Sequence, residues 1–189
     1  FLQANNFRPI AYDNRDVGLS SRFAATPSFV LDYIKYFLRL PIKSEYKIDD
    51  MADDGIQLLE TLKIEKAHIF STSMGGMIAQ IISAQYPEKV KTFTLIASTA
   101  STPSPINAPT KAVREIMLQR SKNPNASYEE IIKREIKMVS LIGMEGREVD
   151  TPEFRKETIE NLDRSKDGSG YARQLLSCLL YTSPSPRDV

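Results

Sequence analysis

The sequence predicts an α/β fold with a parallel sheet, on the pattern of three consecutive segments. Residues 67–70 are a short apolar run of the kind found in strands. Residues 77–86 carry apolar side chains at helical spacing, and the Tyr86-Pro87 pair closes this helix. Residues 90–97 are rich in β-branched and aromatic side chains, which is typical of a buried strand. Strand, helix and strand in this order form one βαβ unit, whose two strands run parallel.

The turn between the first strand and the helix is the candidate functional site, and Ser73 lies in it. A sharp turn of this kind holds such a residue at positive φ, exposes its side chain above the sheet, and directs backbone N–H groups at the same point. It needs small residues two positions before and after the serine. Ser71 and Gly75 meet that need, with Gly76 beside them. An ordinary βα turn with a serine-rich loop is the alternative, and Ser71 lacks the backbone freedom of the glycine usual at its position.

Further segments, taken with this turn, resemble one known family. Residues 12–21 resemble the Asp-x-Arg-x-x-Gly-x-Ser loop that follows the fourth strand of α/β-hydrolases. Residues 46–54 resemble the helix before the strand that carries the nucleophile, and residues 170–174 resemble a cap-helix segment of methylesterase-like members. The chain therefore resembles a serine hydrolase of the α/β-hydrolase fold family up to about Ser177. The loop positions that match the family motif, and are expected to be structural, are Asp13, Arg15, Gly18 and Ser20.

The resemblance implies a partial α/β-hydrolase core over residues 1–100, with three parallel strands retained at residues 8–12, 67–70 and 90–97. A helical cap is expected over residues 101–177. The chain is expected to be truncated at both ends, and residues 178–188, within a tail over residues 178–189, resemble the translation of a sequencing adapter. This tail, with the only cysteine, Cys178, is expected to be non-native; a native Pro/Ser-rich tail is the alternative. Loss of the family's third strand is expected to leave a slot beside the first strand of the βαβ unit, or to make the two strands on either side of it shift together.

Helices are expected outside the βαβ unit as well. Apolar residues recur at helical spacing over residues 29–38, and Asp49 is expected to cap the next helix. In the region of the cap, Ser127 and Glu130 match a capping box, and Pro152 stands at the first position of a further helix.

A serine hydroxyl becomes an effective nucleophile only when a base takes its proton. The resemblance implies Ser73 as the nucleophile, the backbone N–H of Met74 as half of the oxyanion hole, and a triad in the chain order Ser, acid, His. The only histidine, His68, precedes Ser73 by five residues on one strand, ~16 Å away at the rise of a strand, and is expected to be structural. The triad acid and histidine are therefore expected to be absent from this chain. Structural hydrogen bonds are expected for the carboxylates of Asp13, Asp16, Asp53 and Asp54.

The parent protein is expected to be a carboxylic ester hydrolase-like enzyme that cleaves an ester or a related acyl bond of a small-molecule substrate through an acyl-enzyme. Lactonase, thioesterase, C–C hydrolase, perhydrolase and iminopeptidase-like activities stay open. A non-catalytic relative that binds a ligand or a partner protein is the alternative, which Ser71 weakly favours. An NAD-binding protein is disfavoured, because no Gly-x-Gly-x-x-Gly occurs. The isolated chain is expected to be unstable and inactive.

The composition argues against several classes of partner and cofactor. The net charge of +1 gives no electrostatic case for nucleic acid or a membrane surface, and no apolar run approaches the roughly 20 residues of a membrane span. One histidine and one cysteine do not build a zinc site, and neither a metal nor a cofactor is expected. A cytoplasmic location is favoured, with secretion left open because the N-terminus is expected to be missing. The sequence does not predict the oligomeric state.

Overall fold

The sheet of the computed structural model consists of two parallel strands, β1 (Ala67–Thr72) and β2 (Val90–Ile96). They are joined by α3 (Met74–Gln85) and the short turn η2 (Pro87–Lys89), so the predicted βαβ unit is confirmed. The structure describes residues 2–24, 28–38, 40–100, 109–123, 126–165 and 170–181.

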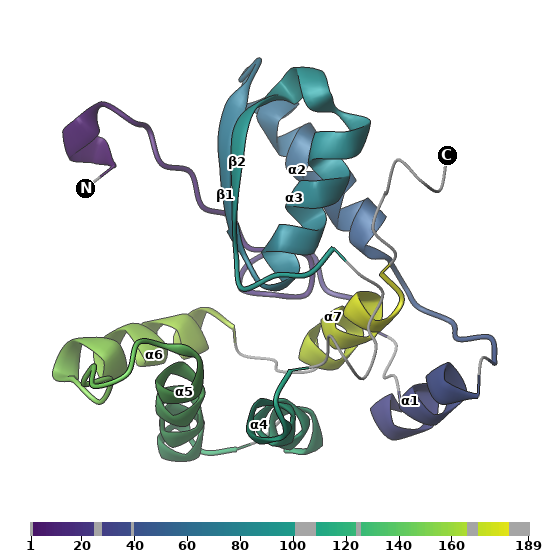
Figure 1. Ribbon diagram of the computed structural model, residues 1–189, viewed down its shortest axis with the longest axis vertical. Helices are drawn as coiled ribbons and strands as arrows, with labels where there is room; N and C mark the ends of the chain where they lie inside the picture. Colours follow the sequence, from purple (N-terminus) through teal and green to yellow (C-terminus); the bar gives the residue numbers. More distant parts are fainter. Residues whose placement is uncertain are drawn as a thin grey trace.

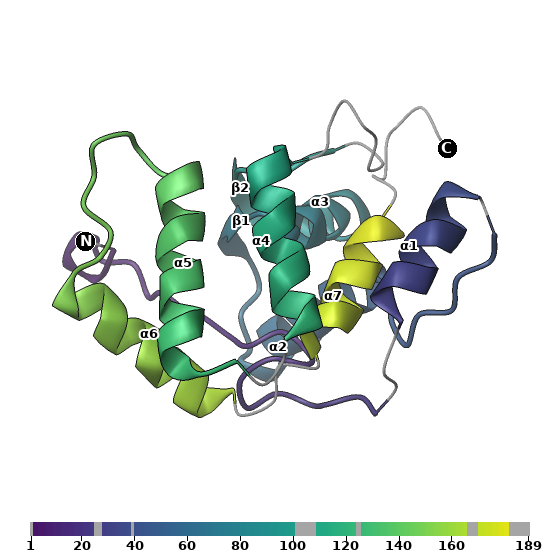
Figure 2. The same cartoon turned by 90° about the horizontal axis from the view of Figure 1, so that it is seen from below.

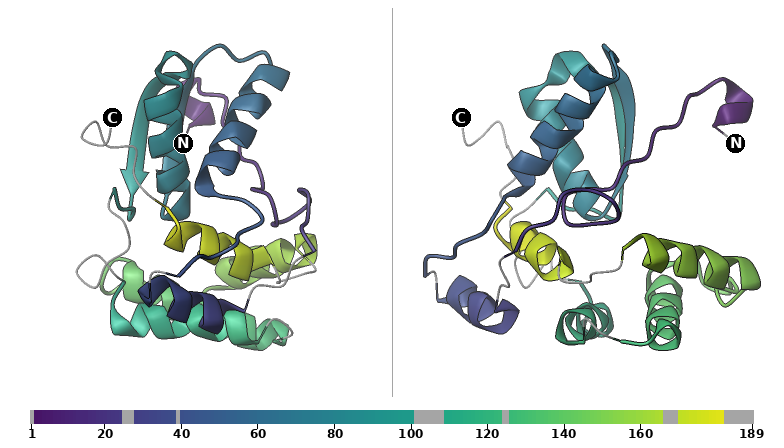
Figure 3. Two further views of the ribbon diagram at one scale, coloured as in Figure 1. Left: turned by 90° about the vertical axis from the view of Figure 1, so that its right-hand side faces the viewer. Right: turned by 180° about the vertical axis from the view of Figure 1, so that it is seen from behind.

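The helices form two layers around this sheet (Figure 1). α2 (Ile48–Thr61) and α3 lie side by side and cover one face of the strands. The second layer lies beyond the carboxyl ends of the strands, whose arrowheads point toward it (Figure 3). Its members are α1 (Phe29–Phe37), α4 (Lys111–Lys122), α5 (Tyr128–Ile142), α6 (Pro152–Arg164) and α7 (Gly170–Leu179). A short turn, η1 (Gln3–Asn5), lies near the N-terminus at one end of the molecule (Figure 2).

Residues 8–12 do not form the third strand that the sequence predicts. The described residues contain a sheet of two strands, and this segment runs as coil beside it. It is held at its ends, where the Phe7 ring meets His68 edge-on at 5.7 Å between ring centroids and the Tyr12 hydroxyl packs against Gly55. A strand needs a neighbour, because ladder hydrogen bonds must offset the loss of chain entropy. With no strand between this segment and β1, the α/β fold class is confirmed with one strand fewer than predicted.

The core lies between the inner face of the sheet and the two helices that cover it. Its most buried side chains include Met51, Ile56, Ile78, Ile81 and Ile82. Along β1 the side chains alternate between half-buried and exposed. β2 is not the buried strand that the sequence predicts, since every side chain after its first residue is exposed. β2 is an edge strand whose main described contacts are with β1 and α3, and these cover only part of its surface.

The helix ends follow local sequence signals, with one correction. α2 begins one residue before Asp49, so the predicted cap at Asp49 is wrong. The Asp50 carboxylate instead accepts a hydrogen bond from the Lys47 N–H at 2.7 Å, which leaves Asp49 inside the first turn. The predicted capping box of α5 is confirmed: the Ser127 N–H donates to the Glu130 carboxylate at 2.8 Å, and the Glu130 N–H donates to the Ser127 hydroxyl at 3.3 Å.

The predicted division into a core, a helical cap and a non-native tail stays a prediction. Residues 101–108 and residues 182–189 lie outside the described residues. Within the described start of the tail, Cys178 packs against the core cluster and Tyr181 is buried in it.

Replacing Phe70 by glutamate should reduce self-association of the chain without a loss of stability. Phe70 is 69% exposed, and among the described residues β1 pairs with a strand on one edge only. An exposed aromatic side chain beside an open strand edge favours pairing between copies, and a charge opposes it. Light scattering over a concentration series measures the change, and the free energy of unfolding should stay within about 0.5 kcal/mol.

Ile69→Glu is the matched control, because it places the same charge on the inner face of the same strand, where Ile69 packs against the core. This variant should lose stability. If Phe70→Glu and the unchanged chain associate equally, the exposed Phe70 side chain does not promote pairing between copies, and the prediction is wrong.

Candidate functional site at the β1–α3 turn

Ser73 lies where β1 ends and α3 begins, with its backbone at φ +49° and ψ −121°. The Ser73 N–H donates to the Ile96 carbonyl at 3.0 Å, and the Ser73 carbonyl accepts from the Gly76 N–H at 2.9 Å. The first bond ties the turn to the end of β2, and the second ties it to the first turn of α3. A side-chain-bearing residue in this region is strained by roughly 1–3 kcal/mol, so its surroundings must hold it there. The predicted positive φ is confirmed, and Ser73 is exposed.

Met74 is the first residue of α3. The first N–H groups of a helix have no acceptor within the helix, and they carry the positive end of its dipole. The Met74 N–H is therefore a donor one residue from Ser73, at the carboxyl edge of the sheet. This arrangement suits an oxygen atom that gains negative charge.

Ser71 and Gly75 face each other across the turn, as the requirement for small residues implies. A Cβ atom placed on Gly75 would lie 3.6 Å from the Cβ of Ser71, which is ordinary van der Waals contact. Ser71 is not among the described residues with positive φ, and its hydroxyl donates to the Thr94 carbonyl at 3.3 Å. Serine therefore fits at position 71, and the backbone freedom of glycine is not needed there.

The tightest approach in this region occurs at Gly76 and was not anticipated from the sequence. A Cβ atom on Gly76 would lie 2.4 Å from both Cβ and Oγ of Ser98, just beyond β2. Gln80 strengthens the same junction, because its amide nitrogen donates to the Thr99 carbonyl at 2.9 Å and to the Gly76 carbonyl at 3.1 Å. Ser98 and Gln80 carry no motif that singles them out. Their one signal is position: the end of the second strand lies beside the turn in any parallel βαβ unit.

His68 lies toward the opposite end of β1 and does not join this site. Its Nδ1 is 2.8 Å from the Thr92 hydroxyl on β2, and its ring contacts Phe7. These contacts fit the structural role that the sequence predicts for it.

The loop over residues 13–21 folds around the backbone and carboxylate of Asp13. The Ser20 hydroxyl donates to the Asp13 carbonyl at 2.6 Å, and the Leu19 N–H donates to its carboxylate at 3.1 Å. Gly18 has φ +54°, and a Cβ atom there would lie 2.1 Å from the same carboxylate, so only glycine fits. Arg164 of α6 pairs with Asp13 at 2.6 Å. The Leu19 N–H, followed by Arg164, lowers the pKa of the Asp13 carboxyl.

Arg15 joins the loop to α2. Its guanidinium donates to both carboxylate oxygens of Asp54, at 2.7 and 2.8 Å, and to the Asp50 carbonyl at 3.1 Å. The guanidinium carbon also lies 5.7 Å from the ring centroid of Phe23 and 5.3 Å from that of Tyr46. The bidentate hydrogen bond to Asp54 pairs the charge of Arg15 with a carboxylate, and together with the ring contacts it holds the side chain in one direction.

Asp16 joins the loop to α7 through a fully buried ion pair. Arg173 donates to both carboxylate oxygens of Asp16, at 2.8 and 2.9 Å, and the Phe23 N–H donates at 2.9 Å. Burial by itself would raise the pKa of the Asp16 carboxyl, but these hydrogen bonds outweigh it, so its pKa lies below the ordinary value. Gly170 allows the approach, since a Cβ atom there would lie 2.2 Å from the Asp16 carbonyl oxygen.

Two further bonds seat α7 on the backbone of the same region. The Gln174 amide donates to the Arg15 carbonyl at 2.8 Å, and the Ser177 hydroxyl donates to the Tyr46 carbonyl at 2.9 Å. Asp53 is the fourth aspartate for which the sequence predicts structural hydrogen bonds, and its carboxylate accepts one from the Tyr86 hydroxyl at 2.7 Å. All four aspartates thus make hydrogen bonds of the kind that the sequence predicts. Their partners on α6 and α7 are distant in sequence and were not predicted.

Two kinds of feature are absent from the part of the chain that the structure describes. No group of three or more histidine, cysteine or acidic side chains gathers as metal ligands do. No helix there is both long enough and apolar enough to cross a membrane.

Gly76→Ala should destabilise the protein by roughly 1–3 kcal/mol, because the new methyl group overlaps Ser98. Gly75→Ala is the matched control and should cost nothing, since a methyl group there makes only an ordinary contact and alanine favours a helix over glycine by about 1 kcal/mol. Urea denaturation measures both. Adding Ser98→Gly to Gly76→Ala should restore most of the lost stability; a double variant no more stable than Gly76→Ala would contradict the proposed overlap.

Asp16→Asn should lower the free energy of unfolding by roughly 3–5 kcal/mol at pH 7, because it removes the carboxylate that compensates the buried charge of Arg173. In the unchanged protein the folded pKa of Asp16 is depressed, so its contribution is complete above the unfolded value of about 4 and is lost as pH falls through the folded value. Denaturation between pH 7 and pH 3 should show this loss in the unchanged protein and a smaller one in Asp16→Asn. Asp150→Asn, at an exposed pair with Arg155, is the control and should change stability much less at pH 7.

Comparison with known proteins gives relatives along most of the chain. Residues 1–135 match the alpha/beta hydrolase fold family. The chain is 26% identical over 162 residues to rhodomycin D methylesterase DauP of Streptomyces sp. (strain C5), and 27% identical over 164 residues to rhodomycin D methylesterase DnrP of Streptomyces peucetius. Each alignment covers 78% of this chain and 49% of the relative, so the chain spans about half the length of these curated relatives.

Solved structures show the same fold. A thermophilic esterase from Thermogutta terrifontis superposes with a TM-score of 0.57 at 17% identity, over 90% of this chain and 53% of that one. The enol-lactonase from Burkholderia xenovorans LB400 superposes with a TM-score of 0.53 at 18% identity, over 91% of this chain and 54% of that one. At these identities the likeness establishes the fold alone. With its βαβ unit, its strand-to-helix turn and a family match over residues 1–135, the chain belongs to the alpha/beta hydrolase fold family.

Proposed function

We propose that the protein to which this chain belongs hydrolyses an ester, or a related acyl bond, with Ser73 as the nucleophile. The observation that supports this most is the backbone of Ser73, held at φ +49° between a strand and a helix with its side chain exposed. We interpret this turn as a nucleophile elbow, in which strain is retained to present a hydroxyl to a substrate. The curated relatives DauP and DnrP are methylesterases, which agrees with chemistry on an ester.

In this proposal the Ser73 hydroxyl attacks the acyl carbonyl and the Met74 N–H donates to the oxygen that becomes negative. Such a donor stabilises the transition state by roughly 3 kcal/mol. The alcohol leaves, and the acyl group stays on Ser73 until water releases it as a carboxylic acid. The small-molecule substrate would approach Ser73 from the carboxyl edge of the sheet, the edge toward which the strand arrowheads point (Figure 3).

The base that activates Ser73 is not found in the described residues. His68 is the only histidine of the chain, and it lies toward the other end of β1 in contact with Thr92. The four aspartates of the loop and of α2 are engaged in the hydrogen bonds described above. Because the chain spans about half of its curated relatives, we place the triad acid and histidine in the other half of the parent protein. The 189-residue chain alone is then inactive.

The geometry at Ser71 weighs against the alternative of a non-catalytic relative. Ser71 departs from the usual glycine, but it has no positive φ, and even a Cβ atom added at Gly75 would meet it at an ordinary distance. Serine at this position is therefore compatible with a working turn.

Ser73→Ala in the full-length parent should lower turnover of p-nitrophenyl esters by several orders of magnitude, up to about 10⁶-fold, because no other group supplies the nucleophile. The same variant should lose labelling by a fluorophosphonate probe. Ser140→Ala, at an exposed position of α5, is the matched control and should keep both. Labelling that persists in Ser73→Ala, or ester turnover that is unchanged, would refute the assignment.

A further inference from the structure

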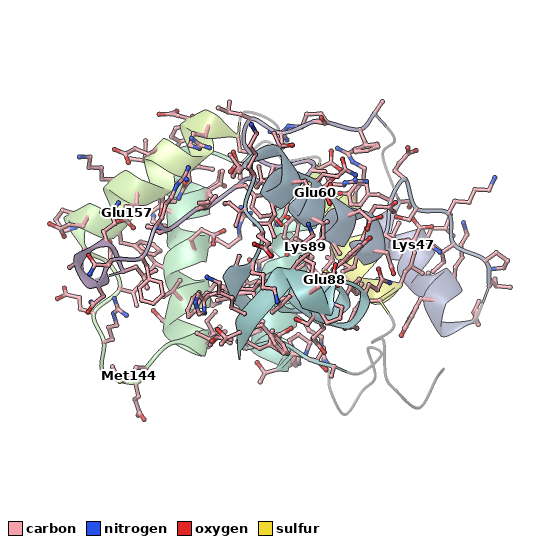
Figure 4. All side chains as sticks on the ribbon, turned by 90° about the horizontal axis from the view of Figure 1, so that it is seen from above. Lys47, Glu60, Glu88, Lys89, Met144 and Glu157 are labelled. Atoms are coloured by element: carbon pink, nitrogen blue, oxygen red, sulfur yellow. The ribbon has the colours of Figure 1, made fainter. Side chains whose placement is uncertain are left out.

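A cavity of about 710 Å³ lies between α1, α7 and residues 42–47, and its lining does not include Ser73 or the turn around it. α1 and α7 contact each other and run side by side (Figure 2), and Lys47 lies between α1 and the start of α2 (Figure 4). The volume falls in the range of sites for small organic molecules, roughly 300–1,000 Å³. Neither the family nor the proposed reaction at Ser73 assigns it a ligand.

One part of the cavity wall is apolar. Leu31 of α1 stands at the more open side and is 50% exposed, whereas Leu176 of α7 is 1% exposed. Ile42 also belongs to this part of the lining. Together they form an apolar surface that leads from solvent toward the interior, which suits a hydrocarbon chain.

The remaining wall carries charges, and two of its cations already have described partners. Lys35 lies 3.6 Å from Asp32, which is itself in the lining and buried. Arg173 is bound to Asp16 as described above. These pairs add little net charge to the cavity.

The other three charged residues leave a surplus of one positive charge. Lys43 and Lys47 are cations, and Glu45 between them in sequence is an acid. All three lie on the segment that joins α1 to α2. The surplus attracts an anion, and the neighbouring carboxylates oppose a second negative charge on the same ligand.

We propose that this cavity binds an amphiphile with a hydrocarbon chain and a single carboxylate headgroup, of the class of medium-chain fatty acids. The chain lies along Leu31, Ile42 and Leu176, and the carboxylate lies beside Lys43 and Lys47. A phosphate monoester, with nearly two negative charges, fits the single surplus charge less well. A neutral ester of the same chain length lacks the attraction to the lysines. The proposal is independent of the chemistry at Ser73.

Leu31→Trp provides a direct test, because the chain contains no tryptophan of its own. A single indole at a half-exposed position of the lining reports on anything bound there. Titration of this variant with 11-bromoundecanoate should quench its fluorescence in a saturable way, since bromine quenches only at contact. Circular dichroism checks that the variant is folded.

Leu141→Trp is the matched control for the position of the indole, because Leu141 is 45% exposed on α5 and is absent from the lining. This variant should show no saturable quenching.

Lys43→Glu, added to Leu31→Trp, should weaken binding at least about fivefold, the effect of roughly 1 kcal/mol. Lys156→Glu, on α6 outside the lining, should leave it unchanged. The methyl ester of the probe should bind more weakly than the acid. Equal quenching at both indoles, no quenching at position 31, or equal binding of acid and methyl ester would overturn the proposal.

Discussion

The buried ion pair between Asp16 and Arg173 is the interaction on which the arrangement of the two helical layers depends. Its carboxylate belongs to a loop that lies against α2, and its guanidinium belongs to α7 in the outer layer. Two charges removed from water repay their desolvation only when hydrogen bonds satisfy them on several sides. Here the Phe23 N–H and both donors of the guanidinium meet the carboxylate. The pair therefore permits one position of α7 against the loop and penalises others.

Two other charged residues of the same loop also form ion pairs with helices. Asp13 meets Arg164 on α6, and Arg15 meets Asp54 on α2. Each of the three charged side chains thus reaches a different helix, so a loop without regular structure organises three elements that are far apart in the sequence. Gly18 and Gly170 make this possible, because any side chain there would overlap Asp13 or Asp16. Of the helices in the outer layer, α6 and α7 are thus tied directly to this loop.

Local features of this fold could be predicted from the sequence, and pairings between distant segments could not. The positive φ of Ser73 follows from a strand, a serine between small residues and a helix in succession, and the capping box of Ser127 needs only four residues. Strand formation at residues 8–12 and burial of β2 depend on neighbours, which a strand-like composition does not supply. The contact of Gly76 with Ser98 and the pairing of Asp16 with Arg173 also join residues that no sequence motif connects.

The two ion pairs that join the loop to α6 and α7 differ in their exposure to solvent. The Arg164 side chain is 52% exposed and that of Asp13 is 26% exposed, whereas the Arg173 and Asp16 side chains are 3% and 0% exposed. Dissolved ions can approach and screen the first pair, and they screen the second far less, because it is closed to solvent. Rising salt would therefore weaken the contact of α6 with the loop, while the contact of α7 with the loop would stay nearly unchanged.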